Sequence, residues 1–273
     1  MTATLRDAVY GQAVGDALGV PYEFRKRGGF HAEGMIGHGT HDQPAGTWSD
    51  DTSMALAICD SIRANDGRID VADMRARFED WYRHDAYTVD GLFDIGNTTV
   101  EALMMGRGCD GEWDNGNGSL MRTIPLAFTG AADDEIRAVS AITHAHPTSM
   151  DACVRLVAFA RLLIAGRSPA EALAEAKPVR ADVASLPEME IRSGGYVLDT
   201  LLAAIWCLLT TDSYAACVLK AVNLGSDTDT TAAVAGGLAG IVYGADGIPA
   251  DWMATLRGKQ VIEQCLFRSA SVG

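Results

Sequence analysis

Apolar residues recur at intervals of three and four along most of the chain. Leu5, Val9 and Ala13 begin this pattern, which is the spacing of a buried helix face. The same spacing continues in the segments 54–62, 154–164, 198–209 and 218–222. Strict alternation of apolar and polar residues, the pattern of a half-buried strand, is hard to find over more than four residues. The sequence therefore predicts an all-α fold.

Glycine and proline clusters separate the predicted helices. They lie at 28–29, 34–46, 108–118, 178–187 and 244–249. No internal repeat is present, and no segment has the length or composition of an interdomain linker. We therefore expect residues 1–273 to form one domain of about ten to thirteen helices, packed as an orthogonal bundle.

Composition and charge limit the classes of partner. With 48% apolar and 21% charged residues, the chain can bury a large core. Its 22 Lys and Arg residues against 36 Asp and Glu give a formal net charge of −14. Such a surface repels phosphate backbones and anionic lipid, so a nucleic-acid partner is not expected.

The cysteines and the apolar runs indicate a cytoplasmic protein. None of the six cysteines forms a CxxC pair, and most lie in helix-like apolar stretches, as expected of buried thiols in a reducing compartment. The N-terminus lacks the apolar core of a signal peptide. The longest apolar run, 232–245, is shorter than the roughly 18 residues that a membrane span requires. No membrane insertion is expected.

Two acidic clusters stand directly before apolar helices. The first contains Ser49, Asp50, Asp51 and Thr52, and the second contains Asp227, Thr228, Asp229, Thr230 and Thr231. Either cluster alone is explained by helix capping, because Asp, Ser and Thr cap helix N-termini and the helix dipole favours negative charge there. Each cluster, however, has two carboxylates and at least two hydroxyls where one cap needs a single oxygen.

Together, the two clusters predict a metal centre. Adjacent carboxylates repel one another unless a cation lies between them. Carboxylate and hydroxyl oxygens without nearby His or Cys suit hard ions such as Mg²⁺ or Mn²⁺. If both helix starts converge, they form a site for two divalent cations. That convergence is itself a prediction.

The second cluster also fits the DxDxT pattern of a phosphatase, with Asp227 as the nucleophile and Asp229 as the acid. That motif needs a preceding strand and a long downstream sheet. The remainder of the chain after Asp229 is short and helical in pattern, so this interpretation fails.

A glycine-rich segment, 114–122, predicts an anion-binding loop. Gly116 and Gly118 permit positive φ and close backbone approach, and a following helix would present free N–H groups to a diphosphate. The alternative is an ordinary Asn-Gly turn. Three further candidates stand in turns beside predicted helices: Glu23, Asp94 and His144. Glu23 follows a helix broken by glycine and proline, where a carboxylate could act as an acid or base.

These segments, in this order, resemble the ADP-ribosylglycohydrolase family. The motifs that carry the resemblance are GDALGVPYEF, GTWSDDTSMAL, DIGNTT, GNGSLMR, THAHP and LGSDTDTTAAVAGGLAG, and they extend over nearly the whole chain. The resemblance implies an all-α hydrolase that binds two Mg²⁺ or Mn²⁺ ions and cleaves the bond between ADP-ribose and an acceptor.

The resemblance also implies roles for individual residues. The metal ligands would be Ser49, Asp50, Asp51, Asp227, Asp229 and Thr230, and Glu23 would be the mobile gating carboxylate. The substrate contacts would be Gly116, Asn117, Gly118, Ser119 and Met121 around the diphosphate, with His144 on the adenosine side. DIGNTT and THAHP favour the bacterial arginine-specific branch, in which Asp94 would lie near the acceptor guanidinium.

The expected reaction is hydrolysis at the ribose C1″, through an oxocarbenium-like transition state, by a water held at the metal ions. Asp50 or Asp51 would take the proton of that water, and Asp94 would favour departure of a protonated guanidine. We expect the substrate to be an ADP-ribosylated protein, modified on arginine. The alternatives are serine, O-acetyl-ADP-ribose or polymer linkages, or an immunity or structural protein on the same scaffold.

Overall fold

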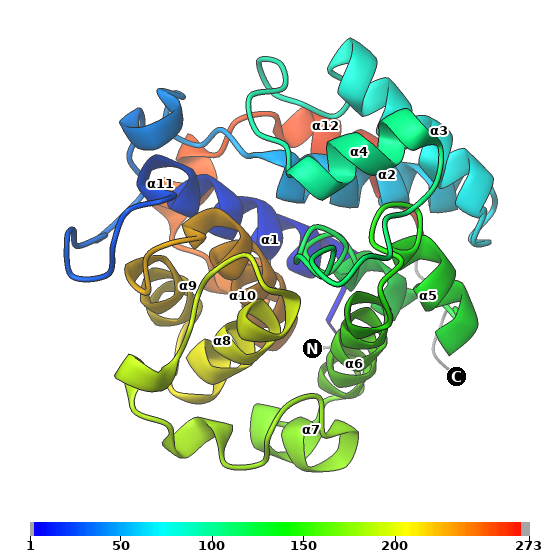
Figure 1. Ribbon diagram of the computed structural model, residues 1–273. Coiled ribbons are helices and arrows are strands. Elements are labelled where there is room, and N and C mark those ends of the chain that lie inside the picture. Colours follow the sequence, from blue (N-terminus) through cyan, green and yellow to red (C-terminus); the bar gives the residue numbers. More distant parts are fainter. Residues whose placement is uncertain (1–2, 269–273) are drawn as a thin grey trace.

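The computed structural model describes residues 3–268, which form twelve α-helices joined by turns and short 3-10 helices (Figure 1). The helices are α1 (Leu5–Gly19), α2 (Asp50–Ala64), α3 (Val71–His84), α4 (Asn97–Met105), α5 (Asp133–Ser140), α6 (Pro147–Ile164), α7 (Pro169–Ala176), α8 (Val197–Leu209), α9 (Tyr214–Asn223), α10 (Thr228–Tyr243), α11 (Ala250–Thr255) and α12 (Lys259–Cys265). Apart from isolated bridges between pairs of residues, this part of the chain has no β-strand. The all-α prediction is confirmed.

Several helix starts follow from local sequence signals. At α1, the Thr4 hydroxyl accepts a hydrogen bond from the Asp7 N–H (3.2 Å), and the Asp7 carboxylate accepts one from the Thr4 N–H (2.8 Å). Ser168 and Glu171 form the same reciprocal pair at the start of α7. Such capping boxes satisfy backbone donors that the helix itself leaves free.

Helices α1 and α10 form the centre of the molecule and pack with their backbones very close together. A Cβ atom at Gly15 would lie 2.1 Å from the carbonyl oxygen of Ala232, and one at Gly19 would lie 2.3 Å from Cα of Asp229. Only glycine fits at these two positions. The contact places the end of α1 directly against the start of α10.

The other helices surround this central pair. Helices α8 and α9 pack beside α10, while α2 and α3 lie on the opposite side of α1 (Figure 1). Helix α6 packs against α5, α7 and α8 along a third side. The start of α2 is thereby brought to the junction of α1 and α10.

All six cysteines are buried and free, so the prediction that they are buried thiols is confirmed. Among the residues that the structure describes, no helix has both the length and the apolar character needed to cross a bilayer.

Candidate active site

Helix α2 begins with two buried acidic residues that do not serve as its cap. Ser49 is the N-cap residue, and its hydroxyl oxygen accepts a hydrogen bond from the Asp51 N–H (3.4 Å). The Ser49 hydroxyl in turn donates to Oδ2 of Asp51 (2.9 Å). Asp50 is 8% exposed and Asp51 is fully buried. Since Ser49 caps the helix, capping does not explain the two carboxylates.

Helix α10 also begins with carboxylates that capping does not explain. Asp227 occupies the N-cap position, but its side chain makes no capping hydrogen bond. Its Oδ2 accepts a hydrogen bond from Nδ2 of Asn117 (2.8 Å), while its buried Oδ1 has no partner. Oδ1 of Asp229 accepts from the Thr230 N–H (3.0 Å), while Oδ2 of Asp229 is buried and unpartnered.

The two acidic clusters meet in the folded chain, as the sequence predicts. The Thr230 hydroxyl donates to Oδ2 of Asp51 at 3.4 Å, which links the start of α10 to the start of α2. Carboxylate oxygens of Asp16, Asp51 and Asp229 all lie within 4.8 Å of one another, and so do those of Glu23, Asp227 and Asp229. Asp229 belongs to both groups, which makes the cluster continuous.

Asp16, on α1, is a member of this cluster that our sequence analysis missed. Its Oδ1 accepts from the Ser49 N–H (2.9 Å), and its Oδ2 accepts from the N–H and the hydroxyl of Thr52 (3.0 and 2.6 Å). These three bonds fix the start of α2 against α1. The signal was present in the sequence: Asp16 is a charged residue in a helix whose residues 8–19 are all buried.

Burial raises the pKa of every carboxyl group in the cluster. It raises the pKa of Asp16 to about 6. The pKa values of Asp51 and Asp229 rise well above their usual range, first because of burial and then because of neighbouring carboxylates. Burial also raises the pKa of Asp227, against the lowering effect of the Asn117 hydrogen bond. Unneutralised, these groups would repel one another at short range.

The cluster has the donor set of a hard-cation site. Oδ1 of Asp51, Oδ1 of Asp227 and Oδ2 of Asp229 are buried without hydrogen-bond partners, which is costly unless something else binds them. Within residues 3–268, no lysine or arginine forms an ion pair with these three residues. The groups offered by this cluster are carboxylate and hydroxyl oxygens, which suit Mg²⁺ or Mn²⁺.

A second group of titratable side chains lies beside the acidic cluster. The His41 ring nitrogen Nε2 and a carboxylate oxygen of Glu23 form a hydrogen bond, and Asp94 lies within 4.8 Å of both. Burial raises the pKa of Glu23 to about 7, against the lowering effect of His41. The hydrogen bond to Glu23 raises the pKa of His41. The structure thus brings Glu23 and Asp94 together as candidates for proton transfer, and adds His41, which the sequence analysis did not identify.

These groups open into a pocket of about 430 Å³. Its lining includes Glu23, Asp50, Asp94, Gly116, Asn117, Gly118, Met121, His144, Asp227 and Thr230. Nearly all the residues that the sequence analysis placed at the substrate therefore surround one cavity. Ser119 is the exception, because it is fully buried and its hydroxyl bonds to that of Ser140 (2.9 Å).

The loop at 116–121 differs in two respects from its expected form. Gly116 and Gly118 do not have positive φ, and residues 117–122 form turns that lead into a 3-10 helix, Ile124–Phe128, instead of an α-helix. Glycine is required at position 118 because there is no room for a side chain: a Cβ atom there would lie 2.7 Å from Cε1 of His144. The glycine allows the loop to lie directly against the imidazole ring.

A buried arginine orients that imidazole. Nη2 of Arg122 donates to the Thr143 hydroxyl (2.8 Å), which is hydrogen-bonded to Nδ1 of His144 (2.8 Å). A guanidinium only donates, so the Thr143 proton remains available to bond Nδ1; when Thr143 donates it, the ring proton lies on Nε2. Burial lowers the pKa of His144 to about 3, so the ring is neutral at physiological pH. In that tautomer Nε2 is a neutral donor beside Gly116 and Gly118. Arg122 and Thr143 were not identified as functional from the sequence.

Known proteins are similar to this chain in both sequence and fold. The family model described as ADP-ribosylglycohydrolase matches residues 2–271. The chain is 36% identical to the ADP-ribosylarginine hydrolase Tri1 of Pseudomonas putida, covering 95% of this chain and 76% of that protein. It is also 36% identical to the ADP-ribosyl-[dinitrogen reductase] glycohydrolase of Rhodospirillum rubrum, covering 91% and 88% respectively. A solved structure titled "ADP-ribosylglycohydrolase-related protein complex" superimposes with a TM-score of 0.79 at 32% identity, covering 94% of each chain.

Proposed function

The chain belongs to the ADP-ribosylglycohydrolase family, and from this premise we propose that it removes ADP-ribose from arginine side chains of proteins. The observation that supports this most directly is the meeting of two buried acidic helix starts with Glu23 and Asp94 at one pocket. The names of the two relatives at 36% identity support an arginine linkage and a protein substrate. We treat residues 1–273 as one catalytic domain, acting in the cytoplasm, where free cysteines stay reduced.

Two divalent cations, Mg²⁺ or Mn²⁺, would be held by side chains from the starts of α2 and α10. The proposed ligands are Ser49, Asp50, Asp51, Asp227, Asp229 and Thr230. The unpartnered oxygens of Asp51, Asp227 and Asp229 fit this role. When bound, such ions lower the pKa of a coordinated water and orient the hydroxyls of the sugar. Asp16 would act indirectly, by fixing the start of α2.

The reaction exchanges one bond at the ribose C1″ for another. A water oxygen forms a bond to C1″, the bond from C1″ to the guanidine nitrogen breaks, and charge develops on the ring oxygen in between. Asp50 or Asp51 would accept the proton that the water loses. The guanidine takes up a proton as it leaves, and Glu23 or Asp94 is placed to supply it or to stabilise the resulting cation.

The rest of the pocket would bind the non-reacting part of ADP-ribose. The loop of Gly116, Asn117 and Gly118 offers close backbone approach to a diphosphate, and Met121 lines the same pocket. His144 would donate from Nε2 to an oxygen of the same ligand. Ser119 faces away from the cavity, so any contribution to binding would come from its backbone N–H.

The decisive experiment measures release of ADP-ribose from an arginine-modified protein, with Mn²⁺ or Mg²⁺ and with a chelator. We expect release that depends on the cation. If the protein hydrolyses serine-linked, O-acetyl or polymeric ADP-ribose but not the arginine conjugate, the substrate linkage is that one and not arginine.

A toxin-protection assay, run beside the release assay, tests whether the chain is instead an immunity protein that acts by contact. An Asp227→Ala, Asp229→Ala double variant should lose all turnover. Protection against a toxin that survives in this variant would show contact in place of catalysis.

A further inference from the structure

A basic groove adjoins the pocket of the candidate active site, beside the turn that contains Glu23. It has a volume of about 580 Å³, and its eleven lining residues include Phe24, Arg25, Lys26, Arg27, Met189 and Arg192. Four of these eleven are cationic and none is acidic. In a chain whose formal net charge is −14, this is a local inversion of sign.

The cations of the basic groove form no salt bridge. Within residues 3–268, no carboxylate lies within ion-pair distance of Arg25, Lys26, Arg27 or Arg192. Seven arginines elsewhere do form such pairs: Arg6, Arg63, Arg77, Arg137, Arg167, Arg180 and Arg257. The cations of the groove are therefore available to attract an anionic group at short range.

The four cations have different parts in the groove. Arg27 is structural, because its guanidinium donates to the carbonyl oxygens of Leu224 (2.8 Å), Glu188 (2.6 Å) and Ile191. These bonds hold the segment 188–191 and the end of α9 against the Glu23 turn. The side chains of Arg25, Lys26 and Arg192 are exposed and free to meet a ligand.

Exposed apolar side chains stand beside these cations. Phe24 is 70% exposed and Met189 is 86% exposed, which is unusual for residues of their size. Both line the groove. Aromatic residues and methionine are enriched where proteins bind other proteins, as is arginine.

The groove is continuous with the proposed active site. Phe24 lines both cavities and directly follows Glu23. The Phe24 N–H donates to the carbonyl oxygen of Ser226 (2.7 Å), and the Ser226 N–H donates to that of Arg25 (2.7 Å). Ser226 immediately precedes Asp227. A ligand in the groove would thus lie next to the groups that surround the scissile bond.

We propose that the basic groove docks an acidic segment of the modified protein, with an apolar side chain of that segment against Phe24 and Met189. This inference rests on the proposed function. A short acidic segment fits the observations better than a nucleic acid or an ADP-ribose polymer. A long polyanion would extend beyond the groove onto acidic surface, which would repel it. A short segment with a few carboxylates would lie entirely within the groove.

The test compares two peptides that carry one ADP-ribosylated arginine, flanked by glutamate in one and by glutamine in the other. The wild type should hydrolyse the glutamate peptide with a kcat/KM about 5- to 10-fold higher than the glutamine peptide at low salt. An Arg25→Gln, Lys26→Gln, Arg192→Gln variant should lose this preference, and so should the wild type in 0.5 M salt. The matched control replaces three exposed cations outside the groove, Arg83, Arg155 and Lys177, with glutamine and should keep the preference.

A direct binding measurement separates this inference from the proposed function. Fluorescence anisotropy of the unmodified glutamate peptide should show binding to the wild type and the control variant but not to the groove variant, whether or not any conjugate is hydrolysed. Equal kcat/KM for both peptides, or equal binding by the groove variant, would overturn the proposal. A short oligonucleotide, poly-ADP-ribose and unlabelled glutamate peptide are then compared as competitors of the bound peptide. If either polyanion displaces it at a lower concentration than the glutamate peptide does, the groove binds that polyanion instead.

Discussion

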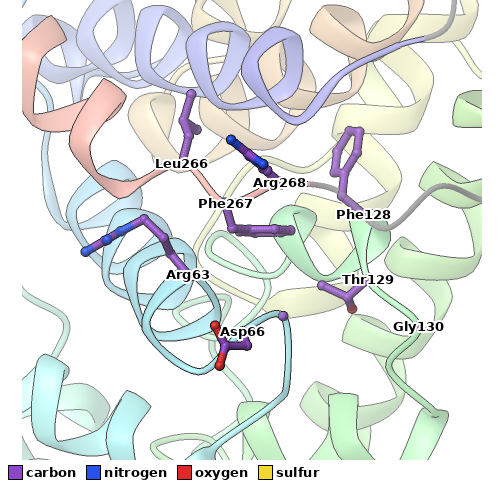
Figure 2. A pocket seen from close by; sticks show the side chains of 9 residues that line it. Arg63, Asp66, Phe128, Thr129, Gly130, Leu266, Phe267 and Arg268 are labelled. Atoms are coloured by element: carbon purple, nitrogen blue, oxygen red, sulfur yellow. The ribbon is translucent and has the colours of Figure 1, made fainter.

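The two ends of helix α2 each border a cavity, and the cavities differ in chemistry. At the N-terminal end, Asp50 lines a pocket of about 430 Å³ among other carboxylates. At the C-terminal end, Arg63 and Asp66 border a cavity of about 610 Å³ with Phe128 and Phe267 (Figure 2). The second cavity is the larger, yet it has no cluster of titratable groups comparable with the first.

The difference lies in how charge is balanced. At the C-terminal end, Arg63 binds the carboxylate of Asp60 through both Nε (3.0 Å) and Nη2 (2.5 Å). At the N-terminal end, Asp51 is fully buried, with one oxygen unpartnered. Cavity volume therefore does not distinguish the candidate site in this molecule. Buried carboxyl groups without partners do so, because burying them is costly unless they are protonated or a ligand binds them.

The largest expected effect comes from removing charge at the N-terminal end of α2. Asp51→Asn and Asp229→Asn should each lower kcat for ADP-ribose release by roughly 1,000-fold, because each removes a proposed ligand of the cations. The matched control is Asp66→Asn at the other end of the helix, which should keep full activity. Equal losses in all three variants would mean that the acidic pocket has no special part in the reaction.

Cation binding should also appear as a gain in stability. With Mn²⁺ at 100 times its Kd, we expect about 2.7 kcal/mol of additional stability, which raises Tm by about 5–10 °C for a chain of this size. The unpartnered oxygens of Asp51, Asp227 and Asp229 are the physical reason. Differential scanning calorimetry of the wild type and Asp51→Asn provides the measurement. An identical shift in both proteins would place the cation elsewhere.

A substitution at the cavity beside the C-terminal end of α2 should lower the stability of the fold without changing kcat. Phe267 is 8% exposed and packs at the larger cavity. Phe267→Ala should lower the free energy of unfolding by about 2 kcal/mol through lost apolar burial, with kcat unchanged. Urea denaturation together with the ADP-ribose release assay measures both quantities. A loss of kcat at unchanged stability would show that this cavity communicates with the active site.

The smallest expected effect is on ADP-ribose binding, and it involves Arg122, a buried charge that contacts α2 between its two ends. Arg122 is fully buried and contacts Met54 of α2 (Nη1 to Sδ, 3.7 Å). Its Nη1 and Nη2 donate to oxygens of Gly118 and Thr143 and to no carboxylate, while its Nε has no partner. Thr143→Val should weaken ADP-ribose binding about 3- to 10-fold, because His144 loses the bond that orients it. Thr143→Ser keeps the hydroxyl and should bind normally by calorimetry. Nitrogen-15 NMR should find the His144 proton on Nε2 in the wild type, and a proton on Nδ1 would refute this orientation.

Local patterns in the sequence predicted several of the twelve helices and the composition of the candidate site. The spacing of apolar residues located α1, α2, α6, α8 and α9, because helix formation depends on near neighbours. The motifs likewise located Asp51, Asp229 and the pocket residues Asp94 and His144. The loop at 116–121 was less predictable, since Gly118 avoids a close contact with the His144 ring from another segment and does not serve to permit a positive φ.

By itself, the sequence determined that this protein is all-α, that two acidic segments precede apolar helices, and to which family it belongs. It left open whether those carboxylates cap helices or bind cations, because both demand the same residues at the same helix positions. Only the tertiary structure showed that capping does not account for all of these carboxylates. The close packing of α1 on α10 brings Asp16, Asp51 and Asp229 within 4.8 Å of one another and leaves oxygens buried without partners. A carboxylate's environment depends on residues far away in the chain, and these become its neighbours only when the helices pack.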